Sequence, residues 1–337
     1  MSGELLLPRA AGEFISQHSQ HVKINEKGVQ KLAEQLVDMV KDTGYNMKIW
    51  KESHVLNPQV MNEASVDWIF VVDTLNFNFW SEDESKRFVI EYKGQRYTGY
   101  WSLCAVINRA LDDGIPMTDP KFYCQVTENE LAHIFRSDSP YSIPLLDKRL
   151  KVLHEAGQKL VQKYDGSFVN VLKKAEQSAQ DLMKLVASEF QSYNDTATYQ
   201  GNKVAFYKRA QILIADIWAC FEGEGLGKFH DIDTITMFAD YRIPQVLAYF
   251  EVLEYSEELM NKLKKNEVLV SGSQLEVELR GSSIQAVELL AKEMKRIARP
   301  GKTMNAVMID HYIWDYRREH CNDLRHIPYH KIRCIYY

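Results

Sequence analysis

Cysteine is scarce in this chain of 337 residues. Its cysteines form no Cys-x-x-Cys pair and are scattered, at Cys104, Cys124, Cys220, Cys321 and Cys334. An odd, scattered set argues against a disulfide framework and against a thiolate zinc site. We therefore expect an intracellular protein of a reducing compartment, the cytoplasm or also the nucleus.

Long apolar runs are absent as well. The sequence has no uninterrupted stretch of 18 or more apolar residues, so we expect no transmembrane helix and no membrane partner. The first residues include Glu4, Pro8 and Arg9 and lack the apolar core of a secretory signal.

The chain also lacks an excess of basic residues. Lys and Arg number 41 against 46 Asp and Glu, giving a net charge of −5. Duplex binding requires a strong basic footprint, so we expect no stable nucleic-acid partner, although a local basic pocket for one phosphate is compatible with this charge.

Phosphate-loop, dinucleotide, HExxH and GxSxG motifs are absent, and the glycine-rich segment 223–227 follows a predicted helix rather than a strand.

Glycine (16) and proline (9) are rare, and no low-complexity linker divides the chain. We predict a mainly α protein forming a single domain over residues 1–337. Apolar residues recur at helical spacing over about 26–43, 101–112, 168–186, 206–221, 284–297 and 304–319. Pro244 suits the first turn of a helix that we expect to continue through Leu263.

One segment predicts β structure. The β-prone arms 87–92 and 96–100 flank Lys93, Gly94 and Gln95, which predicts an inserted β-hairpin. Residues 67–79 are dense in Val, Ile, Phe and Trp, and periodicity does not decide between a buried helix and a strand.

The first candidate for chemistry is Asp240, just before the helix predicted at Pro244. A helix N-terminus stabilises a carboxylate as the anion, and an oxocarbenium-like transition state requires an anion beside the anomeric carbon. The alternative is a capping residue with no other role. Nearby Phe238 suits stacking on a base, or ordinary core packing.

The second candidate is the last predicted helix. Met304, Met308, His311 and Asp315 share one face, so Asp315 continues an apolar stripe, where a charge is unusual. Asp310 lies on a different face. Two carboxylates beside large apolar residues indicate a polar pocket that accepts N–H groups of a guanine-like edge or pairs with an ammonium group. The alternatives are an ion pair with Arg317 or Arg318 and simple exposure.

Basic residues supply two weaker candidates. Lys208 and Arg209 suit a phosphate or ribose contact, against the simpler interpretation of a solvated helix face. The C-terminal tail carries His330, Lys331 and Arg333 among aromatic residues, which indicates a docked segment that either meets a 5′-phosphate or only packs. His54 and Trp101 have no motif signal of their own.

Taken together, these segments resemble the queuosine salvage protein family, and the similarity covers about residues 8–337. It is carried by Trp68–Trp80, Gly99–Cys104, Phe206–Gln211, Thr236–Arg242 and Trp314–Tyr316. The resemblance implies a helical architecture like that of helix-hairpin-helix DNA glycosylases. It also implies an N-glycosylase that hydrolyses queuosine 5′-phosphate to queuine and ribose 5-phosphate, for salvage of queuine into tRNA, without a metal or organic cofactor.

Residue by residue, the resemblance implies that Asp240 is the catalytic carboxylate and that Lys208 supports it or the sugar–phosphate. It implies that the base site is lined by His54, Phe238, Asp310 and Asp315. Two rival functions remain at this point: a glycosylase acting on a base flipped from nucleic acid, and a protein that binds queuine or its nucleotide without chemistry.

Overall fold

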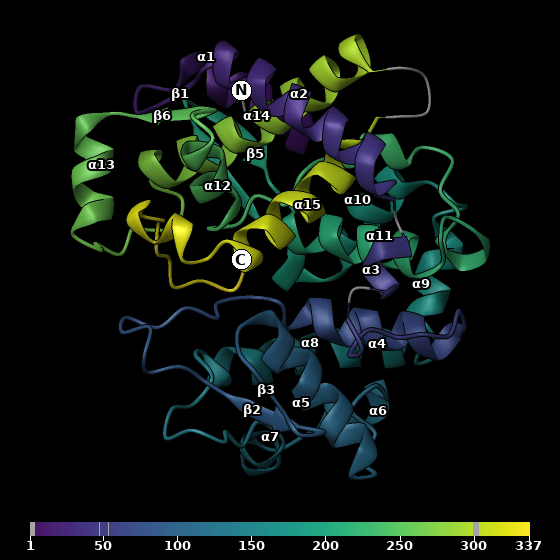
Figure 1. Cartoon of the computed structure of the whole chain (residues 1–337). Helices are drawn as coiled ribbons and strands as arrows, with labels where there is room; N and C mark the ends of the chain where they lie inside the picture. The colour runs from purple at the N-terminus through teal and green to yellow at the C-terminus, as the bar shows by residue number, and fades with distance from the viewer. Residues whose placement is uncertain (1–3, 47, 53, 299–302) are drawn as a thin grey trace.

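The computed structural model describes residues 4–46, 48–52, 54–298 and 303–337. In these ranges the chain is mainly helical, and its strands form three two-stranded antiparallel pairs. Figure 1 shows a lower body, built from the first half of the chain, beneath an upper body that joins the N-terminal helices to the C-terminal ones. The mainly α prediction is therefore confirmed.

The lower body and the helices beside it contain the first hydrophobic core. Its elements are α3 (Lys48–Glu52), α4 (Glu63–Thr74), β2 (Ile90–Tyr92), β3 (Gln95–Tyr97), α5 (Tyr100–Asp112), α6 (Pro120–Tyr123), α7 (Glu128–Ile134), α8 (Leu146–Lys163), α9 (Phe168–Lys174), α10 (Ala179–Glu189), η1 (Gln191–Tyr193), α11 (Lys208–Cys220), η2 (Gly225–Gly227) and η3 (Ile232–Thr234).

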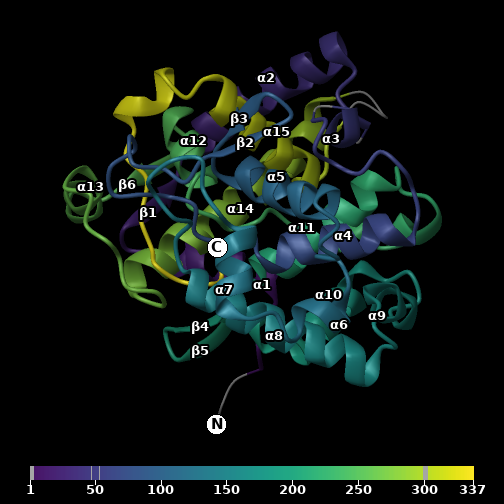
Figure 2. The same ribbon diagram turned by 90° about the horizontal axis from the view of Figure 1, so that it is seen from below.

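The upper body contains a second core. Its elements are α1 (Pro8–His18), β1 (Val22–Ile24), α2 (Glu26–Thr43), β4 (Thr196–Tyr199), β5 (Asn202–Ala205), α12 (Ile243–Tyr249), β6 (Leu253–Tyr255), α13 (Glu257–Lys264), α14 (Gln274–Ile297), α15 (Ala306–Glu319) and η4 (Asp323–His326). Trp314 packs against both cores. The pairs β1–β6 and β4–β5 lie at the periphery (Figure 2), so helices form the interior.

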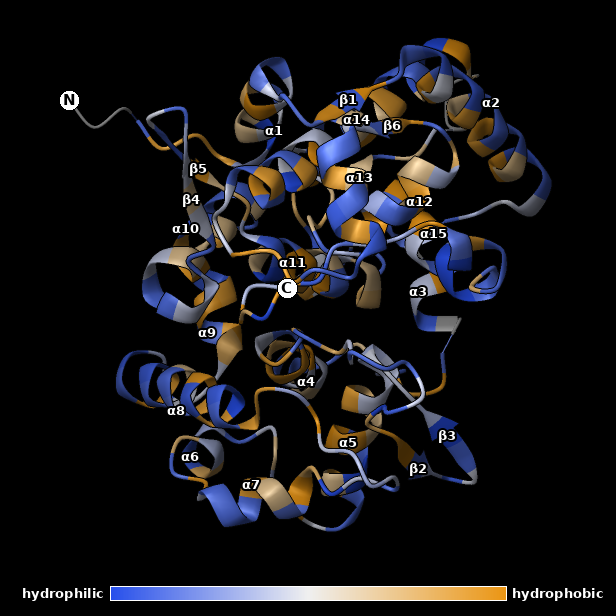
Figure 3. Ribbon diagram, turned by 90° about the vertical axis from the view of Figure 1, so that its left-hand side faces the viewer, coloured by the Kyte–Doolittle hydropathy of each residue, from blue (hydrophilic) through white to orange (hydrophobic). Residues whose placement is uncertain are grey.

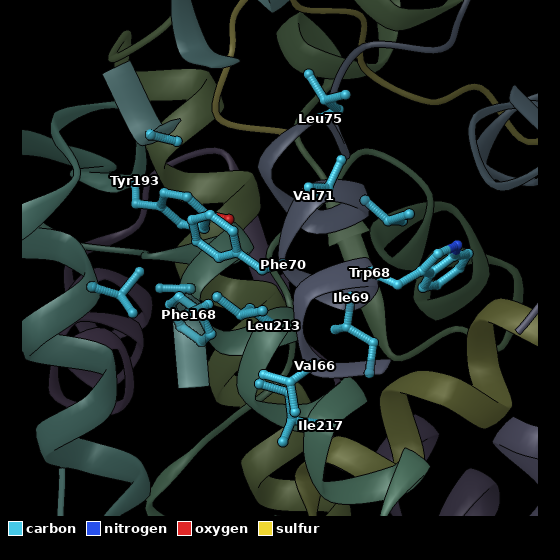
Figure 4. Packing of buried hydrophobic residues seen from close by; sticks show 14 of the residues in the cluster. Val66, Trp68, Ile69, Phe70, Val71, Leu75, Phe168, Tyr193, Leu213 and Ile217 are labelled. Atoms are coloured by element: carbon cyan, nitrogen blue, oxygen red, sulfur yellow. The ribbon is translucent and has the colours of Figure 1, made fainter. Parts of the chain in front are cut away.

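Helix α4 explains why residues 67–79 were ambiguous. It is buried on nearly every side, so its apolar residues show no helical period. Figure 4 shows Phe70 of α4 beside Phe168 and Tyr193, and the Phe70 and Phe168 rings stack with centroids 4.3 Å apart. By contrast, α8 shows many hydrophilic residues in Figure 3, as expected of an amphipathic surface helix.

The upper body depends on a close helix crossing. Helices α1 and α14 approach so closely that a Cβ atom added at Gly281 would lie 2.5 Å from Cγ2 of Ile15. A Cβ added at Gly12 would lie 2.6 Å from Cγ2 of Ile284. Only glycine permits this contact between the two backbones.

The predicted hairpin is confirmed with shorter strands, and its turn residues Lys93 and Gly94 have φ values of 49° and 74°. The pairs β1–β6 and β4–β5 were not predicted. The predicted helix through Leu263 is wrong, because α12 ends at Tyr249 and the chain forms β6 before Ser256 caps α13. Residues 168–186 form two helices rather than one, because Glu176 and Gln177 have left-handed φ values.

Candidate active site

A cavity of about 220 Å³ lies where the two bodies meet. Its walls combine lower-body residues such as Trp101 with upper-body residues such as Trp314 and Asp315. The figures place α11, α15 and the C-terminus at this junction (Figures 1 and 3). The aromatic lining includes Tyr45, Trp50, Phe79, Trp80, Tyr100, Trp101, Trp218, Phe238, Tyr241, Trp314 and Tyr337. An apolar pocket with a few charged groups is typical of a small-molecule site.

Asp240 lines this cavity at the start of α12. Its Oδ1 accepts the backbone N–H groups of Arg242 at 2.7 Å and Ile243 at 2.8 Å. Asp240 therefore pairs two N–H groups at the start of α12, whose N-cap is Arg242. Among the described residues no hydrogen bond engages Oδ2, so these contacts leave one oxygen of the carboxylate for a ligand.

Lys208 begins α11, and its preceding residue Tyr207 has a left-handed φ of 46°. The expected solvated face is wrong, because Lys208 is only 6% exposed and lines the cavity. Its Nζ donates to the carbonyl oxygen of Asn76 at 3.3 Å. Burial lowers the pKa of Lys208, and the negative charge of Asp240 acts in the opposite direction.

Arg209 does not join Lys208 in the cavity. It is 1% exposed, and its guanidinium donates to the backbone carbonyls of Thr74 and Ser192. The idea that it contacts a phosphate or ribose is therefore wrong, and its role is to tie α11 to α4 and η1.

Phe238 lines the cavity, and Asp310 holds it in place. Oδ2 of Asp310 accepts the backbone N–H of Phe238 at 2.9 Å. Asp310 is 4% exposed and is not among the lining residues. Burial raises its pKa well above the usual value, and the charge of Asp240 adds to this shift.

Asp315 lines the cavity from α15, together with Met308 and His311, as their shared helix face predicts. Burial raises the pKa of Asp315 to about 6, with Arg318 opposing and Glu319 adding to the shift. Within the described chain, neither Arg317 nor Arg318 comes within 4.0 Å of this carboxylate, so the ion-pair alternative is wrong. The carboxylate is therefore available to a ligand.

His54 lies behind one wall of the cavity. Its ring stacks on Trp101 with centroids 3.5 Å apart and an interplanar angle of 13°. Burial lowers the pKa of His54 to about 4, with a smaller contribution from Arg318, so the ring is neutral at pH 7. Trp101 lines the cavity, whereas His54 does not.

Four arginines line the cavity: Arg87, Arg242, Arg317 and Arg318. Arg242 forms an ion pair with Glu84 at 3.4 Å. Arg242 donates to Gln245 at 3.2 Å and lies 3.7 Å above the ring centroid of Tyr329. Nε of Arg317 is buried and has no hydrogen-bond partner among the described residues. Burial and the charge of Arg242 lower the pKa of Arg317 to about 10.

The C-terminal tail is docked, as predicted, but its own basic groups do not line the cavity. His330 is 1% exposed. Nη1 of Arg333 donates to Asn78 Oδ1 at 2.6 Å and to the carbonyl of Trp80 at 3.0 Å. These contacts support the packing interpretation of the tail.

Comparison with known proteins identifies the family. The family model for queuosine salvage protein matches residues 56–337. Proteins named queuosine 5′-phosphate N-glycosylase/hydrolase match nearly the whole chain. That of Bos taurus is 47% identical over 99% of both chains, and that of Mus musculus is 45% identical over 99% of this chain and 100% of its own. The Schizosaccharomyces pombe protein is 42% identical over 96% and 98%.

The chain belongs to the queuosine salvage protein family. The resemblance stated from its motifs is thereby confirmed, and the predicted residues Lys208, Phe238, Asp240 and Asp315 lie around one cavity. No helix of the described chain is long and apolar enough to cross a membrane.

Sequence reasoning missed several charged residues in the wall, among them Glu84, Arg87 and Asp216, and considered Arg317 only as an ion-pair partner. Asp216 lies on the apolar face of α11, with Leu213 and Ile217. The signal that identified Asp315, a carboxylate within an apolar stripe, was therefore present at Asp216 as well.

Proposed function

We propose that this queuosine salvage protein hydrolyses the N-glycosidic bond of queuosine 5′-phosphate, giving queuine and ribose 5-phosphate. The observation that carries the proposal is the set of charged and aromatic groups that line one cavity. The carboxylates of Asp240 and Asp315 share this cavity with the ring of Phe238 and with Arg317, whose buried Nε has no hydrogen-bond partner among the described residues.

These groups complement the three parts of the substrate. The 5′-phosphate lies against Arg242 and Arg317, since guanidinium groups bind phosphate with charge-assisted hydrogen bonds. The ribose then lies at Asp240 and Lys208. The base stacks on Phe238, and its cationic cyclopentene-diol arm or its guanine-like edge reaches Asp315.

The chemical structure of the base limits how the bond can be broken. Queuine is a 7-deazaguanine, so a ring carbon replaces the N7 that accepts a proton when a purine leaves. More of the barrier must therefore be lowered at the ribose, where Asp240 stabilises the positive charge that develops as the C1′–N9 bond breaks. Water then adds to C1′, and the proton that it loses balances the proton taken up by the departing base, so that one water is consumed. Lys208 supports Asp240 and the sugar–phosphate.

Asp310 and His54, which were predicted to line the base site, act in this proposal by positioning residues that line the cavity. Asp310 places Phe238 through its backbone hydrogen bond, and His54 supports the ring of Trp101. A neutral His54 stacks on Trp101 without adding a charge next to a cationic ligand.

The resemblance to helix-hairpin-helix DNA glycosylases is also part of the proposal. Two helical bodies with a ligand cavity at their junction support it. Superposition on a DNA glycosylase structure tests it, and an unrelated helix order would overturn it.

The activity is tested with purified protein, queuosine 5′-phosphate, free queuosine and queuosine-containing tRNA in parallel, with queuine followed by mass spectrometry. Queuine released from the nucleotide supports the proposal. Release from tRNA alone favours the nucleic-acid glycosylase, and binding of the nucleotide without any release favours the binding protein.

A further inference from the structure

Two unpartnered polar atoms lie close together in the cavity wall. Oδ1 of Asp216, on α11, and Nε2 of His311, on α15, are 4.0 Å apart. Both are buried, and neither has a hydrogen-bond partner among the described residues. The Asp216 side chain is 4% exposed. Because buried polar atoms in proteins nearly always have partners, this pair indicates a ligand group that is hydrogen-bonded here when the site is filled.

The position of the pair relates it to the base. Phe238 and His311 both line the cavity, and their rings lie 5.7 Å apart in an edge-to-face arrangement. A base stacked on Phe238 therefore presents an edge to His311 and Asp216. The 7-deazaguanine base has two hydrogen-bond acceptors on its six-membered ring, the carbonyl oxygen and N3, which lie on opposite sides of that ring.

The surroundings of Asp216 favour its protonated form. Burial raises its pKa well above the usual value, and the charge of Asp73 adds to this shift, whereas Trp50 and Lys208 lower it. The titratable, charged and hydrogen-bonding groups that interact with Asp216 lie on five helices: Trp50 of α3, Asp73 of α4, Tyr100 and Cys104 of α5, Lys208 and Cys220 of α11, and Asp310 and His311 of α15. The other three cavity carboxyls differ in their contacts: Asp240 accepts two backbone N–H groups, Glu84 forms ion pairs with Arg87 and Arg242, and Asp315 has a pKa of about 6.

We propose that Asp216 is the general acid of the reaction, with His311 holding the pyrimidine edge of the base beside it. The inference rests on the proposed function. As the C1′–N9 bond breaks, its electron pair passes into the ring and the proton of Asp216 passes to the carbonyl oxygen or to N3. Water adds to C1′ and releases one proton, and the Asp216 carboxylate regains a proton, so that the net change is the consumption of one water.

A general acid at Asp216 compensates for the N7 atom that a 7-deazapurine lacks. A purine leaves with a proton on N7, and a 7-deazapurine lacks that acceptor. Neutralising the negative charge on the pyrimidine edge is the remaining way to assist departure, and general acids of this kind contribute roughly 10²–10⁴-fold to rate. Asp216 is a cavity carboxyl whose burial raises its pKa well above the usual value, which is the direction that a general acid requires.

The test is the pH profile of queuine release by wild type and by Asp216→Asn, which keeps the size and neutral charge of the group but cannot transfer a proton. We expect kcat to fall about 100-fold or more. Activity of the wild type should decline at high pH as Asp216 ionises, and this decline should be absent in the variant. KM should change by less than about threefold.

A second measurement uses the leaving group. A 7-deazaguanine nucleotide with an electron-withdrawing nitrile at C7 needs less acid assistance, so Asp216→Asn should lose less activity on it than on queuosine 5′-phosphate. The matched variant Asp73→Asn removes a charge that raises the pKa of Asp216, from a residue that does not line the cavity. It should move the high-pH decline to lower pH.

The inference is overturned if Asp216→Asn stays within threefold of wild type. It is also overturned if the loss is equal at every pH and for both leaving groups, because a merely structural role gives that result. A wild-type protein that releases no queuine at all would instead remove the proposed function and, with it, this inference.

Discussion

The carboxylate of Asp310 accepts the backbone N–H of Phe238 at 2.9 Å, and this bond joins helix α15 to the loop that carries Asp240. Because Asp310 does not line the cavity, we expect it to act by placing Phe238. Asp310→Asn keeps an acceptor oxygen and should retain queuine release within about tenfold. Asp310→Ala leaves the N–H unpaired, costing about 1–3 kcal/mol, and should weaken queuine binding by a factor of ten or more.

Queuine release followed by mass spectrometry tests the activity of Asp310→Asn, and isothermal titration with queuine measures the affinity of both variants. Equal, severe loss in Asp310→Asn and Asp310→Ala would show that the carboxylate itself contacts the base.

From the raised pKa of Asp315 we expect queuine binding to release protons. Its folded-state pKa of about 6 lies above the usual value, so near pH 5.5 much of it is protonated in the free protein. A cationic arm favours the ionised form. Queuine binding at pH 5.5 should therefore release a fraction of a proton, detected by calorimetry in buffers of different ionisation enthalpy. Asp315→Asn should abolish the release and lower turnover strongly, whereas normal turnover in this variant would remove Asp315 from the base site.

The burial of His330 leads us to expect that the free energy of unfolding decreases as pH falls. Burial lowers its pKa to about 3, with a further contribution from Arg280, whereas an unfolded histidine has a pKa of about 6.5. The unfolded state therefore binds more protons below pH 6.5, and the stability contributed by the neutral ring is lost as pH falls. This residue alone should lower the free energy of unfolding by about 2 kcal/mol between pH 7 and pH 5.

Denaturant unfolding of wild type and His330→Phe at the two pH values measures this loss. The difference between the two pH values should be smaller in the variant by that amount. An unchanged difference would show that His330 is charged in the folded protein.

We expect Arg317 to determine the preference for queuosine 5′-phosphate over free queuosine. Arg317→Met removes a buried guanidinium from the cavity, so kcat/KM for queuosine 5′-phosphate should fall about 10- to 150-fold, the equivalent of a charged hydrogen bond. The value for free queuosine should stay nearly constant. Arg96→Met, at an exposed position on β3, is the control and should change neither value. Equal losses on both substrates would place the phosphate elsewhere.

Local patterns predicted most of the helices but not how they pack. The apolar stripes of α2, α11, α14 and α15 have the helical period, so their existence followed from the sequence. Helix α4 was ambiguous because burial on all sides removes that period. The strands of β1–β6 come from residues 22–24 and 253–255, and such short segments gain their pairing only from the packing of α1, α12 and α14 around them.

The site residues also divide into those that local sequence patterns identified and those whose positions depend on packing. Asp315 was identifiable because a charge interrupts an apolar stripe, and Asp240 because it precedes a helix. For Lys208 the helix pattern alone left a solvated face as an alternative, because its buried position depends on contacts such as that with the carbonyl of Asn76, which lies 132 residues away in the chain. Family resemblance therefore contributed the residue roles that periodicity did not contain.

The central claim is that Asp240 performs chemistry in addition to pairing two N–H groups at the start of α12. The most direct measurement compares wild type and Asp240→Asn for queuine release from queuosine 5′-phosphate and for binding of queuine. The asparagine oxygen keeps both of these hydrogen bonds, so the fold and queuine binding should persist, with affinity within about threefold, while turnover falls by about 10³-fold or more. Turnover within tenfold of wild type, in a variant that still binds queuine, would contradict the account.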